Sequence, residues 1–503
     1  MNVVDKLVSF FSPDAGRKRM SSRMALDAMG KSLRKFEAAA GGRRTEGWTS
    51  VNSSTNLDLI ASLPRLRARS KDLVRNNGYA RNGIGRIANN TVGTGIIPTP
   101  KNVTDGISKK IMQAWEIWGE KLDCDFDGKL NFYGLQKMVM RTVAKSGECI
   151  IRRVKTKHKE GAVPLQLQVL EPDFIDSSRN TQQINGKGSY SVNGIEYNGD
   201  GKIVGYWLFS RHPLEWVTES KLVPAEDVIH VYDLEDPGQN RGIPFLTSSM
   251  LRIRDFDEYE DAQLLRQKIA ACFSVFISEN ASLSPLQLPD KSAQQLERVE
   301  PGIIEHLPPG KTVQFANPPA AEGYDKYSQQ VLRAISAGIG VSYEALTNDL
   351  SNVNFSSGRM GWIEFQRNIE HWQWLMLIPV FCDKAWDWFV EAAALAGFVE
   401  IGKKIPVNWT APRREMIDPV KETQALSDQV RNGFVSWWDA VKSLGENPSD
   451  IMAQLIKDAK AFDEAGLKPA CDPRFDTNRG NDLKWSSKQG SKKDDKGDDE
   501  KED

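Results

Sequence analysis

Apolar residues recur at helical spacing through the first part of the chain. From 57 to 89 they recur every three or four positions, which predicts helix with Pro64 near its start, where proline is tolerated. The stretches 107–122 and 132–145 predict two further amphipathic helices. Beyond them, from 148 to 235, apolar and polar side chains alternate in short runs between Gly, Asn and Pro residues. This alternation predicts a β-rich subdomain.

Helical spacing returns after the β-rich part. Apolar residues from 256 to 276 form one stripe, which predicts a helix about 30 Å long. The stretch 278–319 is strand-like again, and its segments 302–307 and 312–316 flank a Pro-Pro-Gly-Lys turn. We therefore expect a hairpin there, followed by a second helix over 324–339.

The C-terminal part alternates between polar connections and helices. The segment 347–358 (TNDLSNVNFSSG) is polar and predicts an exposed loop between two helices. Residues 415–466 predict a small helical module, and the residues after 473 are too polar to fold alone. Between these, 360–396 predicts one helix rich in tryptophan, whose aromatic side chains we assign mainly to the core and otherwise to a subunit interface: Trp362, Trp372, Trp374, Trp386 and Trp388.

Composition places the chain among ordinary globular proteins. Its 503 residues correspond to about three domains, and 40% are hydrophobic and 26% charged. The longest strongly apolar run, from Trp374 to Phe381, is interrupted by Pro379 and is far too short to span a bilayer. The N-terminus has no secretory signal, so we expect the chain to stay in the cytosol. The cysteines are odd in number and scattered, which is typical of reduced thiols: Cys124, Cys149, Cys272, Cys382 and Cys471.

Charge is unevenly distributed along the chain. Residues 1–81 carry 16 Lys and Arg against 7 Asp and Glu, a local charge of +9, whereas the whole chain carries −1. A basic N-terminal portion beside an acidic body is compatible with contact to nucleic acid or to an acidic partner, and equally with a solvated arm. Both interpretations remain open on charge alone.

Two short motifs resemble ligand-binding sites. Residues 25–32 (ALDAMGKS) match a relaxed phosphate-binding loop, but they lack the preceding strand and the flexible glycines that such a loop needs. Asp123, Asp125 and Asp127 start a calcium-loop pattern, but its twelfth position is Gly134 instead of a bidentate glutamate. We therefore expect an acidic turn between helices, with Gly128 supplying the left-handed residue.

No arrangement of residues predicts catalysis. The histidines lack a metal-binding spacing, and no serine lies in a Gly-x-Ser-x-Gly motif: they are His158, His212, His230, His306 and His371. We therefore expect no catalytic residues, no metal and no cofactor, and a protein that is not an enzyme.

Several segments, taken in order, resemble the portal proteins of tailed bacteriophages, specifically the lambda-like family. The resemblance covers about 57–465; the arm before it and the tail after it lie outside, and the paired tryptophans at 437 and 438 depart from the family pattern. It is carried by RARSKDLVRNNGYARNGIGRIANNTVGTGI (67–96), the W-x-x-W of Trp115 and Trp118, SGE (146–148), LQLQVLEPDFID (165–176), NGIEYNGDGKIVGYWL (193–208), VPAEDVIHVYD (223–233), PGQNRGIPFL (237–246), ISAGIGVSYEALTNDLSNVNFSSGRM (335–360), IDPVKE (417–422) and RNGFVSWWDAVKSLGENPSDI (431–451).

The resemblance implies an α+β portal-protein fold with a β-rich wing, long stem helices, a clip hairpin and a helical crown. Mapped onto this sequence, the parts are a basic, loosely ordered arm (1–56), a wing (57–255), a stem helix (256–277), a clip (278–319), a second stem helix (320–346), a tunnel loop (347–358), a tryptophan-rich helix with a return to the wing (359–414), a crown (415–466) and a charged tail (467–503).

The resemblance also implies a function. A dodecameric ring at one capsid vertex of the virion would conduct double-stranded DNA during packaging and ejection. Its partners would be the terminase large subunit, the major capsid and scaffold proteins and the head–tail connector proteins, with assembly in the host cytoplasm and no membrane contact. ATP hydrolysis would belong to the separate motor.

Site residues follow from the same resemblance. The tunnel loop would line the DNA path with Asn348, Asp349, Leu350, Ser351, Asn352, Val353, Asn354, Phe355, Ser356 and Ser357. The proposed subunit contacts are Arg359, which would pair with a neighbouring subunit's carboxylate, and Trp362, Trp372 and Trp374. Two alternatives remain: a virion adaptor or scaffold that never encircles DNA, and an ATP- or metal-dependent DNA enzyme built on 25–32 or on Asp123 to Asp127.

Overall fold

The structure is a computed structural model that describes residues 54–157, 161–181, 188–216, 218–271, 275–279, 311–315, 323–351, 353–412, 416, 418–467, 477–478 and 481–482. The chain divides into two units, Met1–Asp58 and Leu59–Asp503. Except for the first turn of one helix, the elements below belong to the second unit. The arm with its 25–32 motif, most of the tail, the segment 302–307, and Cys272, Cys471, His158 and His306 lie outside the described residues.

The first helical stretch is two helices instead of one, α3 (Thr55–Asn76) and α4 (Gly78–Val92). Asn77 separates them in an extended conformation, and its side-chain oxygen accepts the Ala80 N–H at 2.8 Å. This cap satisfies an amide that has no partner at a helix start, so a new helix can begin there. Since α3 already begins at Thr55, Pro64 lies in the helix interior and not near its start.

The next two helices confirm the predicted pair. They are α5 (Asp105–Trp118) and α6 (Phe132–Ser146). α5 ends a turn earlier than the spacing predicted, and the short helix η2 (Leu122–Cys124) follows it. Asn131 caps α6 by accepting the Gly134 N–H at 2.9 Å.

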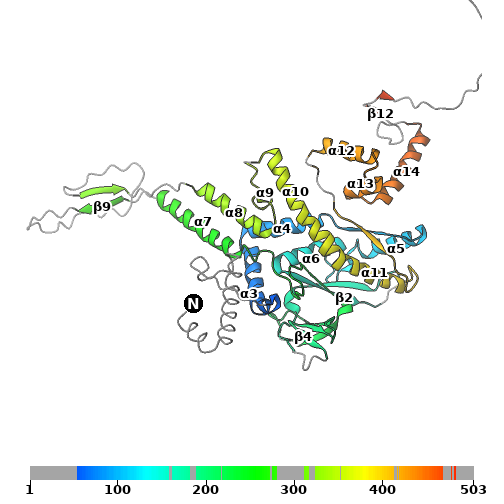
Figure 1. Ribbon diagram of the computed structural model, residues 1–503, viewed down its shortest axis with the longest axis horizontal. Coiled ribbons are helices and arrows are strands. Elements are labelled where there is room, and N and C mark those ends of the chain that lie inside the picture. Colours follow the sequence, from blue (N-terminus) through cyan, green and yellow to red (C-terminus); the bar gives the residue numbers. More distant parts are fainter. Residues whose placement is uncertain are drawn as a thin grey trace, which may run out of the picture. The chain divides into compact units, whose positions relative to one another are not determined.

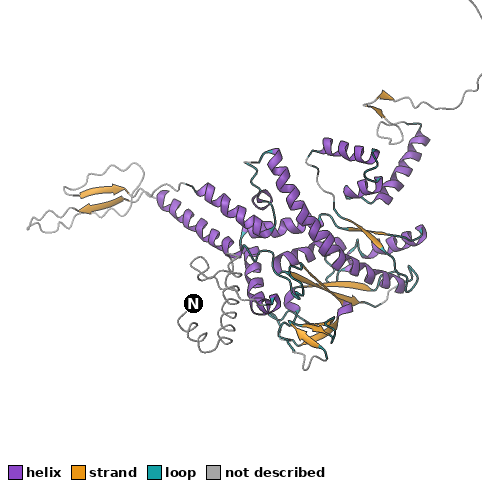
Figure 2. Ribbon diagram, in the orientation of Figure 1, coloured by secondary structure: helices purple, strands orange, loops and turns teal. Residues whose placement is uncertain are grey.

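The β-rich part is confirmed as two small antiparallel sheets (Figure 2). One has the strand order β3-β2-β8, from Leu165–Leu170, Glu148–Lys155 and Val228–Tyr232. The other has the order β4-β5-β6-β7, from Tyr190–Val192, Ile195–Tyr197, Ile203–Phe209 and Ser220–Pro224. Two short 3-10 helices, η3 (Pro172–Phe174) and η5 (Ala225–Asp227), lie between strands.

Two helices run alongside each other before and after a strand pair (Figure 1). α7 (Met250–Ala271) begins before the predicted 256 and ends before the predicted 276, because the chain forms a strand from Val275, whereas α8 (Tyr324–Ile339) has the predicted bounds. The rings of Tyr259 and Tyr324 stack with centroids 6.1 Å apart, which holds the helices together. Between them, β10 (Lys311–Phe315) pairs with β9 (Val275–Glu279), directly after α7. The sequence analysis placed the partner of β10 at 302–307, so its pairing with β9 was not predicted.

The tryptophan-rich helix has three segments instead of one. α10 (Phe355–His371) continues into the π-helix η6 (Trp372–Cys382) and then into α11 (Asp383–Leu395). Pro379 lies in η6, and in a regular α-helix its ring would clash with the carbonyl four residues earlier. The wider π-helical turn accommodates it. Even with this apolar segment, no helix in the described part of the chain is long and apolar enough to cross a membrane.

After α11 the chain returns to the N-terminal helices and then forms the predicted helical module. β11 (Val407–Thr410) pairs with β1 (Ile97–Pro100). The module consists of α12 (Pro419–Arg431), α13 (Trp437–Ser443) and α14 (Pro448–Ala465). Its turns contain Gly433 and Gly445, both with positive φ, as the Asn-Gly and Gly-Glu-Asn-Pro sequences predicted. The short strands β12 (Thr477–Asn478) and β13 (Asn481–Asp482) pair with each other.

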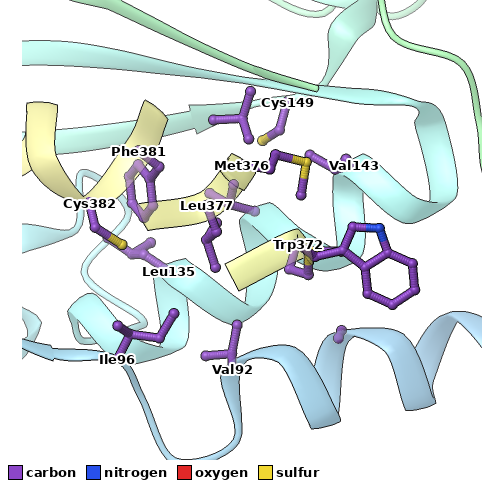
Figure 3. Packing of buried hydrophobic residues seen from close by; sticks show 14 of the residues in the cluster. Val92, Ile96, Leu135, Val143, Cys149, Trp372, Met376, Leu377, Phe381 and Cys382 are labelled. Atoms are coloured by element: carbon purple, nitrogen blue, oxygen red, sulfur yellow. The ribbon is translucent and has the colours of Figure 1, made fainter. Parts of the chain in front are cut away.

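The main core lies where α4, α6 and η6 meet the three-stranded sheet (Figure 3). Figure 3 shows Leu135 of α6 near Leu377 and Phe381 of η6, and Val143 of α6 beside Met376. Aromatic rings from α5, α6 and α11 continue the same cluster: Trp115, Trp118, Phe132, Trp386 and Phe389. Of the five tryptophans in the predicted helix 360–396, Trp372, Trp386 and Trp388 are buried in this core, as their helical spacing predicted.

A buried carboxylate joins α3 to strands β2 and β8 and to the segment that follows β8. Glu148 is fully buried at the start of β2. Its oxygens pair with Arg67 of α3 and with Arg241 at 2.7 Å, and they lie 2.9 Å from His230 Nε2 and 2.8 Å from the Gly242 N–H. Burial opposes its ionisation, but the two guanidinium groups outweigh burial and hold the pKa of Glu148 well below its usual value. The carboxylate therefore stays charged and holds these segments together.

Replacing Glu148 should destabilise the fold strongly. Glu148→Ala leaves Arg67 and Arg241 buried without a counter-charge, and we expect the free energy of unfolding to fall by about 3–5 kcal/mol. Glu391→Ala is the matched control: its carboxylate pairs with Arg153 at 2.6 Å but is 62% exposed, so a loss below about 1 kcal/mol is expected. Urea denaturation followed by tryptophan fluorescence measures both. Equal losses in the two variants would contradict the role assigned to Glu148.

Candidate functional site

The predicted tunnel loop is shorter in the structure than in the sequence analysis. It begins after the short helix α9 (Tyr343–Thr347) and ends where α10 begins at Phe355. Only 348–354 is therefore non-helical, and 355–358 form the first turn of α10. The Asn354 carbonyl accepts the Gly358 N–H at 3.0 Å, which starts that helix. Asn352 and the side chains of Phe355, Ser356 and Ser357 lie outside what the structure describes.

The beginning of the loop is fastened to α4. Asn348 has a left-handed backbone, with φ of 58°, which asparagine tolerates better than most residues. Its side-chain oxygen accepts a hydrogen bond from Arg86 Nη2 at 2.5 Å. One turn earlier on α4, Asn82 donates to the Ala345 and Leu346 carbonyls at 3.0 and 2.6 Å. The loop therefore leaves α9 in a direction that α4 determines.

Asp349 is held by its own neighbours. One carboxylate oxygen accepts the Tyr343 hydroxyl at 3.0 Å, and the other accepts the Ser351 hydroxyl and N–H at 2.5 and 3.0 Å. The hydrogen bonds from Ser351 and Tyr343 lower the pKa of Asp349, so it is ionised at neutral pH. Arg333 covers the Tyr343 ring, 5.5 Å from its centroid.

The exposed surface of the loop is neutral apart from that carboxylate. Leu350 is 67% exposed at its tip. Val353 lies against Gly358, where a β-carbon would come within 2.7 Å of Val353 Cγ1, so only glycine fits at that position without a shift. The guanidinium group of Arg86 contacts the loop, where Asn348 accepts its hydrogen bond. The loop therefore offers amides, hydroxyls and one carboxylate, which cannot hold phosphate tightly.

The four proposed subunit contacts differ in exposure. Trp374 is 49% exposed, and Arg359 is exposed without an ion pair among the described residues. Trp362 is half-buried, and with Arg359 it lines a cavity of about 540 Å³ whose far wall includes Glu422 and Leu426 of α12. These three remain candidate contacts.

The assignment of Trp372 to a subunit contact is wrong. Trp372 is only 5% exposed, because its ring packs against Phe245 within the same subunit, with centroids 5.4 Å apart. The π-helical turn directs Trp372 into the core and Trp374 outward. Little of its surface is left for a neighbouring subunit, so Trp372 is a core residue.

The calcium-like loop is a structural turn, as the sequence analysis expected. Asp125 is buried, and its carboxylate accepts N–H groups from Asp127, Lys129 and Leu130 at 3.2, 2.8 and 3.0 Å. Gly128 has the predicted positive φ, 64°. Both carboxylate oxygens of Asp125 therefore already accept hydrogen bonds from backbone N–H groups.

Another group of side chains has metal-like spacing. Glu171, Asp173 and His212 lie close enough to share an ion. However, Lys71 Nζ donates to both carboxylates, and Lys145 Nζ lies 3.0 Å from Glu171. Two ammonium groups therefore already balance these acids, and the group is an ion-pair network. The grouping of His212 with Glu171 and Asp173 was not predicted, because His212 lies about 40 positions from the two acids along the chain.

The remaining described histidine, His371, lies 3.1 Å from Asp233. The Asn82 and Arg86 contacts to the loop were also missed, although both residues lie in the segment 67–96 that carries the family resemblance. No local signal singles them out, because the same helix also carries Arg81, Asn89 and Asn90.

Comparison with known proteins gives a consistent result. The family model described as "Phage portal protein, lambda family" matches residues 41–373, starting within the segment that the sequence analysis left outside the resemblance. The "Probable portal protein" of Halomonas phage phiHAP-1 is 24% identical over 459 residues, covering 86% of this chain and 88% of that protein. Portal protein B of Escherichia phage lambda is 24% identical over 501 residues, covering 87% and 92%. Among solved structures, a chain in the neck of a native GTA particle computed with C12 symmetry has a TM-score of 0.45 and 15% identity, covering 75% of this chain and 94% of that one.

Calcium should not stabilise the turn at Asp125, because the backbone already uses its oxygens. We expect the melting temperature to be the same with calcium and with a chelator. Asp125→Ala should lower the free energy of unfolding by about 1–3 kcal/mol, since three N–H groups lose their acceptor. Asp123→Ala, on an exposed neighbour, is the control and should change stability little. A chelator-reversible rise in melting temperature would show that the turn is a cation site.

Proposed function

Because this chain belongs to the lambda family of phage portal proteins, we propose that it forms a dodecameric ring at one capsid vertex and conducts double-stranded DNA during packaging and ejection. The observation that carries this proposal is the family match over 41–373, which includes most of the segments where the resemblance was found. A heterologous interface forms a closed ring when the rotation between neighbouring subunits is a full turn divided by a whole number. In such a ring the exposed aromatic surface of each subunit is covered by its neighbour, and no filament forms.

We propose that the elements form the parts of such a portal. We assign α3 to β8 to the wing, α7 and α8 to the stem, β9 and β10 to the clip, and α12 to α14 to the crown. The proposed partners are the terminase motor, which hydrolyses ATP, the major capsid and scaffold proteins, and the head–tail connector proteins. Arg359, Trp362 and Trp374 are the proposed contacts between subunits.

The tunnel loop is the proposed constriction around DNA. A channel that passes any sequence must not bind phosphate tightly, because each Lys or Arg contact adds salt-dependent affinity. The loop's exposed Leu350 and its carboxylate at Asp349 meet that requirement. The alternative of a metal-dependent DNA enzyme is disfavoured by the use of Asp125 in a backbone turn.

The first prediction is a closed ring with a central hole. End-on views of the purified protein by negative-stain electron microscopy, together with its mass by native mass spectrometry, test it. Only monomers or dimers across conditions, including assembly with capsid protein, would contradict the proposal. Rings without a pore wide enough for duplex DNA would favour the adaptor alternative.

A positive charge at the loop tip should impede DNA movement. Leu350→Lys places a lysine from every subunit in the channel, and we expect intact rings with less packaged or retained DNA, more so at low salt. Leu350→Gln controls for lost apolar surface. Leu395→Lys adds the same charge at another exposed leucine, at the end of α11, and should package normally. Normal packaging by Leu350→Lys rings would remove this loop from the DNA path.

A further inference from the structure

We infer that α4 is a platform that positions the tunnel loop, with Asn82 and Arg86 as its positioning residues. The expected effect on DNA retention rests on the proposed function, whereas the contacts between α4 and the loop do not depend on it. None of the sequence motifs assigned a role to either residue beyond the helix they lie on.

The first support is the way α4 completes α9. A helix as short as Tyr343–Thr347 leaves its last carbonyls without partners in the helix. Asn82 supplies them, donating to both Ala345 and Leu346. Gly83, next to it, permits close approach, because a β-carbon there would lie 3.2 Å from Leu346 Cδ1. α9 is therefore seated on one face of α4.

The second support is the contact at the first loop residue. Arg86 lies one turn along from Asn82 and donates to Asn348 at 2.5 Å. Asn348 thus has two roles, since it also supplies the left-handed backbone that ends α9. A hydrogen bond to a charged donor is stronger than a neutral one, so it restrains the loop where the chain changes direction.

The third support is the attachment of α4 to the stem. Asn77, which caps α4, donates to Asp257 of α7 at 2.6 Å, and the Tyr79 ring contacts Phe256 at 6.1 Å between centroids. The N-terminal end of α4 thus contacts α7, and its middle contacts the loop. The position of the loop is consequently set relative to the stem helix.

Backbone N–H groups at the start of the loop report whether the loop is held in place. Asn348, Asp349 and Ser351 each use an N–H in a local hydrogen bond, to Glu344, Thr347 and Asp349 respectively. Their exchange with solvent deuterium therefore reports whether the start of the loop is held. This readout does not depend on DNA.

The test compares loop variants in the full-length protein. Asn348→Gly keeps the left-handed backbone but removes the acceptor, and Asn348→Asp keeps both. We expect amide exchange over 348–351 to become about tenfold faster in Asn348→Gly and in Arg86→Ala, and to stay slow in Asn348→Asp. Arg81→Ala, at an exposed position of the same helix, should leave it unchanged.

The double variant shows whether the two substitutions act through the Arg86–Asn348 hydrogen bond or loosen the loop independently. If Arg86 acts through Asn348, combining Arg86→Ala with Asn348→Gly should speed exchange no more than the faster single variant. Additive effects, or an unchanged rate in Asn348→Gly, would overturn the platform. Because Asn348 is exposed, the exchange rate of the Asn348→Gly single variant tests the platform even if Arg86→Ala does not fold.

A DNA measurement tests the consequence. Where Leu350→Lys lowers DNA retention as proposed, Asn348→Gly particles should also retain less DNA than Asn348→Asp particles. Equal retention would overturn the positioning role. If Leu350→Lys instead has no effect, the loop does not line the DNA path, while the exchange rates still decide whether α4 holds the loop.

Discussion

The fold depends on keeping one carboxylate charged in a place that water does not reach. Glu148 is the shared partner of Arg67 and Arg241, and removing it would strand two guanidinium groups in the interior. Directly beside it, Gly147 and Gly242 pack backbone against backbone, where a β-carbon on Gly242 would lie 2.1 Å from the Gly147 carbonyl oxygen. The charge and the close contact together determine how the first strand of the β-rich part meets the helices.

The ion pairs of Glu148 and the contact between Gly147 and Gly242 hold β2 in place, and the core packs against this strand. The core of α4, α6 and η6 is built on the sheet that starts at Glu148, and its buried aromatic rings leave little room for adjustment. α4 carries that rigidity outward, because one face packs in the core while Asn82 and Arg86 hold a polar loop. The loop that is proposed to line the DNA path is joined to this helix at Asn348, so the helix determines where the loop begins.

Much of the fold could be predicted from local pattern, but the site only in outline. The bounds of α8, the alternation of the β-rich part and the turns at Gly433 and Gly445 follow from periodicity and turn chemistry. The loop was located by its polarity, yet its end was misplaced, because Ser and Gly also suit the first turn of a helix. Nothing local distinguishes Trp372 from Trp374, although one is in the core and the other is exposed.

The sequence by itself determined which segments are helix, strand or polar loop and, through its matched segments, the family. These properties depend on residues within a few positions of one another. Only the tertiary structure decided which distant side chains meet: the pairing of Glu148 with residues 81 and 93 positions away, the contact of Arg86 with Asn348 across 262 positions, and the choice of β9 as the partner of β10. Such contacts depend on which surfaces pack together, and no periodicity along the chain records that choice.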